Sequence, residues 1–499
     1  MFSRITGAFR DIAMATVFGD GASVALFIIA FRFALLLRRF FGEGPLGSAF
    51  IPRYLFEKET SLKKADTFFC DLFIKLGVFT LFIAAAIYLL IAIFTSVFPS
   101  QDSQIQMFAM IKLFLPVIVI VALYGLTIAL HQSHQRFFCS QVSATLTNIM
   151  WLIGIFFSKD LPAEQALVLL TRFIVTGFIF TLLFSFFTMP RSTLLTFKSF
   201  NVLNVFKFSS SMRRLVYSFL LGIVGVGAMQ INIFLDALFA LYASSQGPVF
   251  LWYSQRFYQL AFSCFSLAFT SSIIPLVTQH IKAGALDKAK ESFATGASRI
   301  ITTTIPATVA LLVMGYLFID LFFGRGAFSA QGVSKTSLCL LFYSIGLVPT
   351  ALITLLASVF YARDDFKTPL KCSLYAIGIH LFLNTCAVFI LKLGPEFICL
   401  STSISGVCNF FFLYKKADKS KVEFNLSYVR STWMIAFFAG VPTGALIYFS
   451  YQWGLSKYAI MPVAMFTFVT LFSVGSVFTK NRDVYELFAS IFPRLARRG

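Results

Sequence analysis

Long apolar runs separated by short polar loops dominate the chain. A run of about 20 apolar residues is the length that spans a bilayer as a helix. The chain contains fourteen such predicted membrane helices, at residues 5–19, 23–41, 67–98, 107–130, 137–157, 163–188, 211–243, 248–279, 296–323, 333–361, 370–391, 396–414, 431–450 and 458–478. The pattern therefore predicts an all-α, polytopic membrane protein.

Composition supports a membrane protein and narrows its class. Of the 499 residues, 58% are hydrophobic and only 12% are charged, which excludes a soluble domain of this size. The net charge is +20, but the basic residues are spread through loops rather than gathered on one polar domain, so we expect no nucleic-acid partner. The eight cysteines form no CxxC pair, and we expect neither disulfides nor a metal site.

Lysine and arginine alternate between rich and poor loops along the chain. The rich loops include 53–64 and 415–421, whereas Lys159, Arg325, Lys392 and Lys457 stand alone in the others. By the positive-inside rule, the rich loops and both termini are predicted to be cytoplasmic.

Short motifs recur in the two halves of the chain. Residues 49–54 (AFIPRY), which we take to end the second predicted helix, are echoed by residues 272–277 (SIIPLV) at the end of the eighth. Such repeats indicate two pseudo-symmetric six-helix lobes. The predicted divisions are an N-terminal lobe at 1–190, an amphipathic cytoplasmic connector at 191–209, a C-terminal lobe at 210–416, two further helices at 430–479 and a basic amphipathic tail at 480–499.

Arginines interrupt the second predicted membrane helix. Arg32, Arg38 and Arg39 lie in or next to its apolar run, where a cation costs on the order of 3 kcal/mol. We therefore expect them to line a polar cavity that receives an anion, with Arg256 as their counterpart on the eighth helix. Alternatively, Arg38 and Arg39 reach the lipid headgroups, with Glu43 pairing Arg39.

Asp236 is an acidic residue within the seventh predicted helix. Asn232 lies four residues earlier, on the same face of a helix. Carboxylate and amide oxygens suit a hard cation such as Na⁺, and Asn384 on the eleventh helix could add another oxygen. Alternatively, Asp236 pairs with a cavity arginine or lies at a helix end. We expect no cofactor other than this coupling ion.

Motifs of enzyme active sites are missing from the sequence. It contains no Walker A motif, GxSxG, HExxH or clustered carboxylates. His131 and His134 are predicted to lie in a solvated cytoplasmic turn. We therefore expect a transporter that is driven by a gradient or by substrate supply, and not an enzyme.

Several motifs match a known family. The N-terminal segments Ser3-Arg4-x5-Arg10-Asp11 and Arg38-Arg39-Phe-Phe-Gly-Glu43-Gly-x4-Ala49-Phe-Ile-Pro52 resemble the signature of the MurJ/MviN lipid II flippases. Trp252-Tyr253-x2-Arg256 and Tyr361-x3-Asp365-x-Lys367-Thr-Pro369 resemble the same family. The likeness runs from Ser3 to the last predicted helices.

The resemblance implies a transport function. Such a protein would move the peptidoglycan precursor, linked to undecaprenyl pyrophosphate, from the cytoplasmic to the periplasmic leaflet of a bacterial inner membrane by alternating access. Its partners would be lipid II, membrane lipids and the peptidoglycan synthesis machinery, and it would act as a monomer. The last two helices would form a groove for the polyprenyl tail.

The resemblance also implies roles for individual residues. Family cavity arginines match Arg10, Arg38 and Arg256, while Arg4 and Glu43 lie on signature positions. Some members have a Na⁺ site with an aspartate on the seventh helix, to which Asp236 is similar. Arg32 keeps the charge of a common lysine, and the pyrophosphate is expected to contact Arg4, Arg10, Arg32, Arg38, Arg39 and Arg256.

Departures from the family pattern leave other functions open. Ala25 and Gln255 stand where many members have acidic residues, so gating through carboxylate–arginine pairs would rely on Glu43 and Asp236. The alternatives are an exporter of another lipid-linked oligosaccharide or of drugs in the same superfamily, and a membrane-embedded polyprenyl-phosphate enzyme. A drug exporter favours acidic cavity residues, and an enzyme requires Asp or His grouped at one membrane face.

Overall fold

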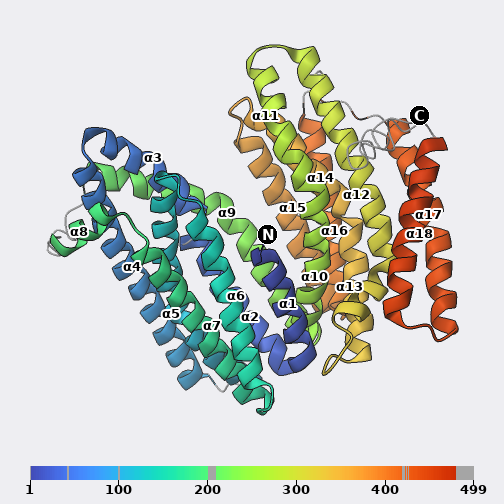
Figure 1. Ribbon diagram of the computed structural model, residues 1–499, viewed down its shortest axis with the longest axis horizontal. Coiled ribbons are helices and arrows are strands. Elements are labelled where there is room, and N and C mark those ends of the chain that lie inside the picture. The colour runs from blue at the N-terminus through green and yellow to red at the C-terminus, as the bar shows by residue number, and fades with distance from the viewer. Residues whose placement is uncertain are drawn as a thin grey trace. The chain divides into compact units, whose positions relative to one another are not determined.

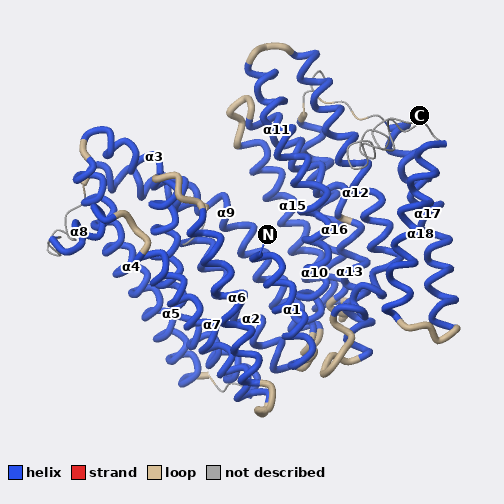
Figure 2. The backbone as a smooth tube through the Cα atoms, viewed as in Figure 1, coloured by secondary structure: helices blue, strands red, loops and turns tan. Residues whose placement is uncertain are grey.

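The computed structural model describes residues 2–41, 44–98, 102–199, 209–417, 422, 424 and 426–478. Within these residues every regular element is a helix (Figure 2). Ten helical stretches in this part of the chain are long and apolar enough to cross a membrane, and shorter apolar helices accompany them. The prediction of an all-α, multi-span membrane protein is confirmed.

Each of the fourteen predicted membrane helices corresponds to one helix or to consecutive helices (Figure 1). In the first half these are α1 (Phe2–Phe18), α2 (Ala22–Phe41), α4 (Leu62–Val97), α5 (Asp102–Ser133), α6 (Phe138–Ser158), α7 (Ala163–Phe187) and α9 (Ser210–Ala243). In the second half they are α10 (Gly247–Phe262) with the π-helix Ser263–Leu267 and α11 (Ala268–Lys282), α12 (Leu286–Phe322), α13 (Ala330–Ile345) with α14 (Leu347–Tyr361), α15 (Lys367–Thr385) with the π-helix Cys386–Ile390, α16 (Glu396–Lys416), α17 (Leu426–Gln452) and α18 (Lys457–Phe478).

Two additional helices lie between these spans. The repeat motif at 49–54 does not end the second membrane helix but belongs to a separate helix, α3 (Pro45–Thr60). The chain breaks at Gly44, whose φ of 74° is left-handed, and Pro45 then begins the new helix. The predicted connector contains α8 (Arg191–Ser199), while residues 200–208, Glu43 and the predicted tail at 480–499 lie outside the described residues.

Contacts divide the chain into two compact units, Met1–Leu241 and Tyr242–Gly499. In the first unit α2 packs against α5, α5 against α4 and α7, and α6 against α7 and α1. In the second, α12 packs against α11, α13, α14, α17 and α18. The contact division places most of α9 with the preceding helices, and the division into six-helix lobes stays a prediction.

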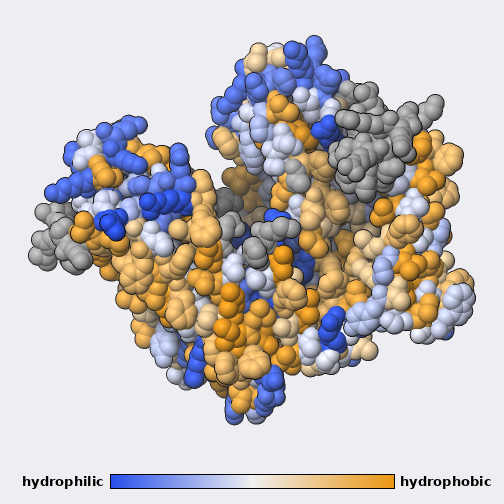
Figure 3. All heavy atoms as spheres, in the orientation of Figure 1, coloured by the Kyte–Doolittle hydropathy of each residue, from blue (hydrophilic) through white to orange (hydrophobic). Residues whose placement is uncertain are grey.

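Apolar side chains cover the lengths of the helices. Figure 3 shows hydrophobic residues along them, and hydrophilic residues gathered over α3 and over the ends of α11 and α12. On α4, for example, Phe82 and Leu90 are 71% and 66% exposed. Side chains of this kind are stable in contact with lipid.

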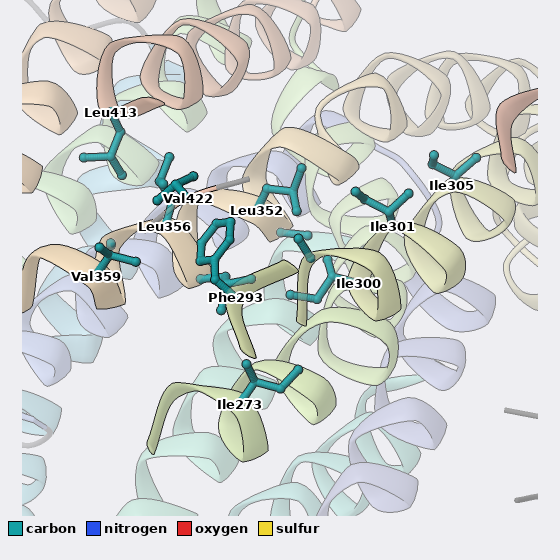
Figure 4. Close-up of a cluster of buried hydrophobic side chains, with 14 of the residues drawn as sticks. Ile273, Phe293, Ile300, Ile301, Ile305, Leu352, Leu356, Val359, Leu413 and Val422 are labelled. Atoms are coloured by element: carbon teal, nitrogen blue, oxygen red, sulfur yellow. The ribbon is translucent and has the colours of Figure 1, made fainter. Parts of the chain in front are cut away.

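The core of the second unit is built around α12 (Figure 4). Ile273 of α11, Phe293 and Ile300 of α12 and Leu356 of α14 are all buried in one cluster. Gly296 permits the close approach of α11, because a Cβ there would lie 2.6 Å from a methyl group of Ile273. The absent side chain thus sets how closely α11 and α12 pack.

A polar clamp joins the start of α18 to the end of α12. Lys457 Nζ donates to Asp320 Oδ1 at 2.9 Å, to the Asp320 carbonyl at 2.9 Å and to the Gly324 carbonyl at 2.8 Å. The Tyr451 hydroxyl of α17 donates to Asp320 Oδ2 at 3.3 Å. An ammonium group is favourable here because the carbonyls at a helix C-terminus carry partial negative charge.

We expect Lys457→Met to destabilise the attachment of α17 and α18. The variant leaves the partly buried Asp320 carboxylate without its cation, at a cost of about 1–3 kcal/mol. Thermal unfolding of the purified protein in detergent measures the change, with the exposed Lys282→Met as control. Equal unfolding temperatures for both variants would contradict a stabilising clamp.

Candidate functional site

Arg10 of α1 is held by groups on two helices. Its Nε and Nη2 donate to Asp11 Oδ1 at 3.0 and 2.8 Å. Its Nη1 donates at 3.0 Å to Oδ1 of Asn148 on α6. The guanidinium carbon lies 4.5 Å from the ring centroid of Trp151, one turn further along α6. The predicted cavity arginine is therefore fixed in place, with a carboxylate and an amide as acceptors.

An aromatic platform supports this arginine. Trp151 is 2% exposed, and Phe31 of α2 packs edge-on against it with the ring centroids 4.8 Å apart. The second unit repeats the arrangement within α10, where the Arg256 guanidinium carbon lies 4.0 Å from the ring centroid of Trp252. A cation over an indole face is attracted by the ring quadrupole. Each unit thus holds one half-buried arginine on a buried tryptophan.

The arginines of α2 occupy different environments. Arg32 is 5% exposed, and its Nη1 donates at 3.2 Å to the carbonyl of Ile233 on α9. Arg38 is half-buried, with its guanidinium carbon 5.9 Å from the ring centroid of Phe178 on α7. Arg39 is exposed, as is Arg4 on α1. Among these four, Arg38 resembles Arg10 most closely in burial.

The predicted cation ligands fall in both units. Asp236 of α9 is 6% exposed, and the Oδ1 atom of Asn232, one turn earlier, is buried without a hydrogen bond from a described residue. Asn384 of α15, in the second unit, is fully buried, with its Nδ2 3.0 Å from His380 Nε2. A buried carboxylate beside a buried, unsatisfied amide oxygen fits the donor set of a hard cation.

The prediction of a solvated turn at His131 is wrong. Helix α5 continues to Ser133, and His131 is fully buried. Its Nε2 lies 2.9 Å from the Ser185 carbonyl and 3.3 Å from Thr188 Oγ1 at the end of α7. The histidine therefore links α5 to α7. Its partners are distant in the sequence, which therefore did not indicate this contact.

The motif at residues 361–369 has a structural explanation. Asp364 adopts a left-handed φ of 58°, and Asp365 Oδ1 accepts the Thr368 amide at 3.0 Å as α15 begins. Hydrogen bonds from the hydroxyl and the backbone amide of Thr368 lower the pKa of Asp365. The acidic side chain thus caps a helix start, where the exposed amides favour negative charge.

An apolar groove of about 590 Å³ lies in the second unit. It is bordered by α10 and its π-helix, by α12 and by α18. Its wall includes Phe257, Leu260, Pro306, Ala310, Met461 and Met465. Phe257 directly follows Arg256, so a single helix carries both the arginine and the groove wall. The pairing of a cation with an apolar groove suits an anionic lipid.

Sequence reasoning missed Asn148 and Trp151. Both lie in the predicted span 137–157, which also contains Gln141 and several serines and threonines, so neither residue stood out. Their contacts with Arg10 depend on the packing of α1 against α6, which the sequence does not show.

Curated relatives resemble the chain along most of its length. A probable lipid II flippase MurJ from Chlamydia muridarum is 26% identical over 425 residues, covering 84% of this chain and 76% of the relative. Another from Thermotoga maritima is 26% identical over 415 residues and covers 83% and 82%.

Solved structures show the same fold. A lipid II flippase MurJ in an inward closed conformation matches with a TM-score of 0.80 at 20% identity, covering 96% of this chain and 97% of that one. An inward-facing multidrug resistance transporter of the MATE family matches with a TM-score of 0.66 at 13% identity, covering 83% and 96%. The family model described as lipid II flippase MurJ matches residues 14–464. The chain therefore belongs to the lipid II flippase MurJ family.

Proposed function

We propose that this protein is a lipid II flippase that moves undecaprenyl-pyrophosphate-linked peptidoglycan precursor from the cytoplasmic to the periplasmic leaflet of the bacterial inner membrane. Family membership over residues 14–464 supports the substrate. The observation that supports this role is that Arg10 and Arg256 are each half-buried against a buried tryptophan, one in each unit.

The arginines bind the pyrophosphate in this proposal. Arg10, Arg38 and Arg256 supply guanidinium groups whose N–H donors match adjacent phosphate oxygens. Aromatic rings next to each guanidinium keep water away, and the attraction between opposite charges is stronger in such surroundings than in water. Arg32 contributes charge near the site, while Arg4 and Arg39, being exposed, contribute to attraction at longer range.

The groove beside Arg256 takes the polyprenyl tail. Its wall is almost entirely aliphatic, aromatic and thioether surface, which an isoprenoid chain can bury without losing hydrogen bonds. α18 forms one side, and the clamp at Lys457 holds that helix against α12. In this proposal α18 contacts the lipid tail and α17 supports α18 by packing against it, while α10 presents Arg256 to the headgroup.

In this proposal a sodium ion binds at Asp236 and Asn232, and the sodium gradient across the membrane drives transport. The buried carboxylate and the unsatisfied amide oxygen on α9 support the site. Asn384 is the further oxygen ligand expected from the sequence. Glu43 takes part in gating between two access states. Both termini are cytoplasmic, as the distribution of basic loops indicates.

Partners follow from the chemistry of the product. Lipid II delivered to the outer leaflet requires enzymes that polymerise and cross-link it, so the protein works beside the peptidoglycan synthesis machinery. It acts as a monomer in this proposal, with the two predicted lobes of one chain as the halves that alternating access needs.

The alternative substrates in the superfamily fit less well. The structural likeness to a MATE transporter concerns the fold alone. A cationic drug would require acidic cavity residues, whereas the half-buried charges on α2 and α10 are Arg38 and Arg256. An exporter of another lipid-linked oligosaccharide remains the second candidate, because the pyrophosphate and the tail would be shared.

We expect Arg38→Ala and Arg256→Ala to abolish flipping, because each removes a charged donor from the pyrophosphate. The affinity for a polyprenyl pyrophosphate should fall roughly 10- to 100-fold. Complementation of a bacterium depleted of its own lipid II flippase, with accessibility of lipid II at the outer leaflet as readout, tests this. Arg172→Ala, an exposed arginine on α7, is the matched control. Rescue by both site variants would disprove the pyrophosphate site.

Filling the groove should separate tail binding from headgroup binding. Ala310→Trp and Met465→Trp place an indole in the space assigned to the polyprenyl chain. We expect roughly tenfold weaker binding of undecaprenyl pyrophosphate and unchanged binding of a short-chain prenyl pyrophosphate. Ala85→Trp, at an exposed position of α4, is the control of equal size. Unchanged long-chain affinity in both groove variants would place the tail elsewhere.

Removal of sodium tests the coupling ion. In proteoliposomes, replacing Na⁺ by choline should slow lipid II transport by the unaltered protein. Asp236→Asn should transport slowly in both buffers, because the carboxylate ligand is lost. Asp287→Asn, an exposed acidic residue on α12, should behave like the unaltered protein. Equal rates for the unaltered protein with and without Na⁺ would favour pairing of Asp236 with an arginine.

A further inference from the structure

Asn148 uses its whole side-chain amide to hold α1. Its Oδ1 accepts from Arg10 Nη1 at 3.0 Å. Its Nδ2 donates to the Ser3 carbonyl and to Thr6 Oγ1, each at 3.1 Å. Both donors and the acceptor of the amide are therefore engaged, and Asn148 is only 7% exposed. A rotated amide would direct its N–H groups at the guanidinium, so these contacts define one orientation.

The contacts leave Arg10 competent to bind an anion. A guanidinium has five N–H donors. Asp11 accepts the Nε–H and one Nη2–H, while Asn148 accepts one Nη1–H. One N–H on each terminal nitrogen remains for another acceptor, and the indole of Trp151 covers the face. The side chain is thus oriented before any ligand arrives, which lowers the entropy lost on binding.

The neutrality of Asn148 matters for an anionic ligand. Asp11 already supplies one negative charge 2.8 Å from Arg10 Nη2. A second carboxylate at position 148 would make the surroundings of Arg10 net negative and would oppose a pyrophosphate. An amide supplies the same acceptor geometry without this charge. One acid and one amide therefore orient the Arg10 guanidinium, and only the acid offsets its positive charge.

We propose that Asn148 is a positioning residue that holds Arg10, and with it the first turns of α1, for binding of the lipid-linked pyrophosphate. The proposal rests on the proposed function, because it takes Arg10 to be a pyrophosphate ligand. Asn148 acts at two levels: it fixes the guanidinium through Oδ1 and the place of α1 along α6 through Nδ2.

The test compares Asn148→Leu and Asn148→Asp in the purified full-length protein. Undecaprenyl pyrophosphate is the probe, and every dissociation constant is divided by that of the unaltered protein at the same pH. Asn148→Leu should raise the ratio roughly tenfold at all pH values, because Arg10 loses one oriented hydrogen bond. Asn148→Asp should raise it further at neutral pH, and the excess should vanish as acidification protonates the new carboxyl group.

Two further variants identify the origin of any loss. Thr6→Val removes one of the two bonds from Asn148 Nδ2 to α1 and no contact of Arg10, so its ratio should rise less than that of Asn148→Leu. Arg10→Ala reports on the proposed function itself and should abolish detectable binding. In transport assays Asn148→Leu should raise KM for lipid II and leave the maximal rate within about twofold.

The outcomes are distinguishable. If Arg10→Ala binds the probe like the unaltered protein, the role assigned to Arg10 under the proposed function fails and this inference fails with it. If Arg10→Ala loses binding while both Asn148 variants retain it, only the positioning role is wrong. If the Leu and Asp variants lose affinity equally at every pH, Asn148 acts through packing alone, which also overturns the proposal.

Discussion

The cost of placing a guanidinium group inside an apolar helix governs the functional part of this structure. The protein meets that cost in three ways. Arg10 receives a carboxylate and an amide, Arg32 donates to a backbone carbonyl of α9, and Arg256 lies on an indole ring of its own helix. Each arrangement supplies interactions that replace part of the lost hydration.

These arrangements differ in what they leave for a ligand. The carbonyl bond of Arg32 ties α2 to α9, and only 5% of its surface is exposed. Arg10 keeps one N–H on each terminal nitrogen beside its bonds to Asp11 and Asn148, and the rings under Arg10 and Arg256 lie against the face of each guanidinium and not its N–H edges. Stacking therefore stabilises a buried cation without consuming the donors that recognise phosphate oxygens, and this supports a division between structural and ligand-binding arginines.

In the second unit, α12 packs against α10, which carries Arg256, and forms part of the wall of the apolar groove. It contacts α11, α14, α17 and α18, and its buried isoleucines fill the core against α14. The clamp of Lys457 fixes α18 against the end of the same helix. The groove wall thus has firmly packed partners on both sides, while α10 passes from Arg256 directly into that wall.

The membrane helices could be predicted from the sequence, because the bilayer sets a helix length, and the arginines of α2 and α10 were conspicuous as charges within apolar runs. The separate helix after Gly44 and the burial of His131 could not, since they depend on a local left-handed turn and on packing against α7. Likewise, the family resemblance pointed to Arg10 but not to its partner. Asn148 lies 138 residues away, and only the packing of α1 against α6 brings the two side chains together.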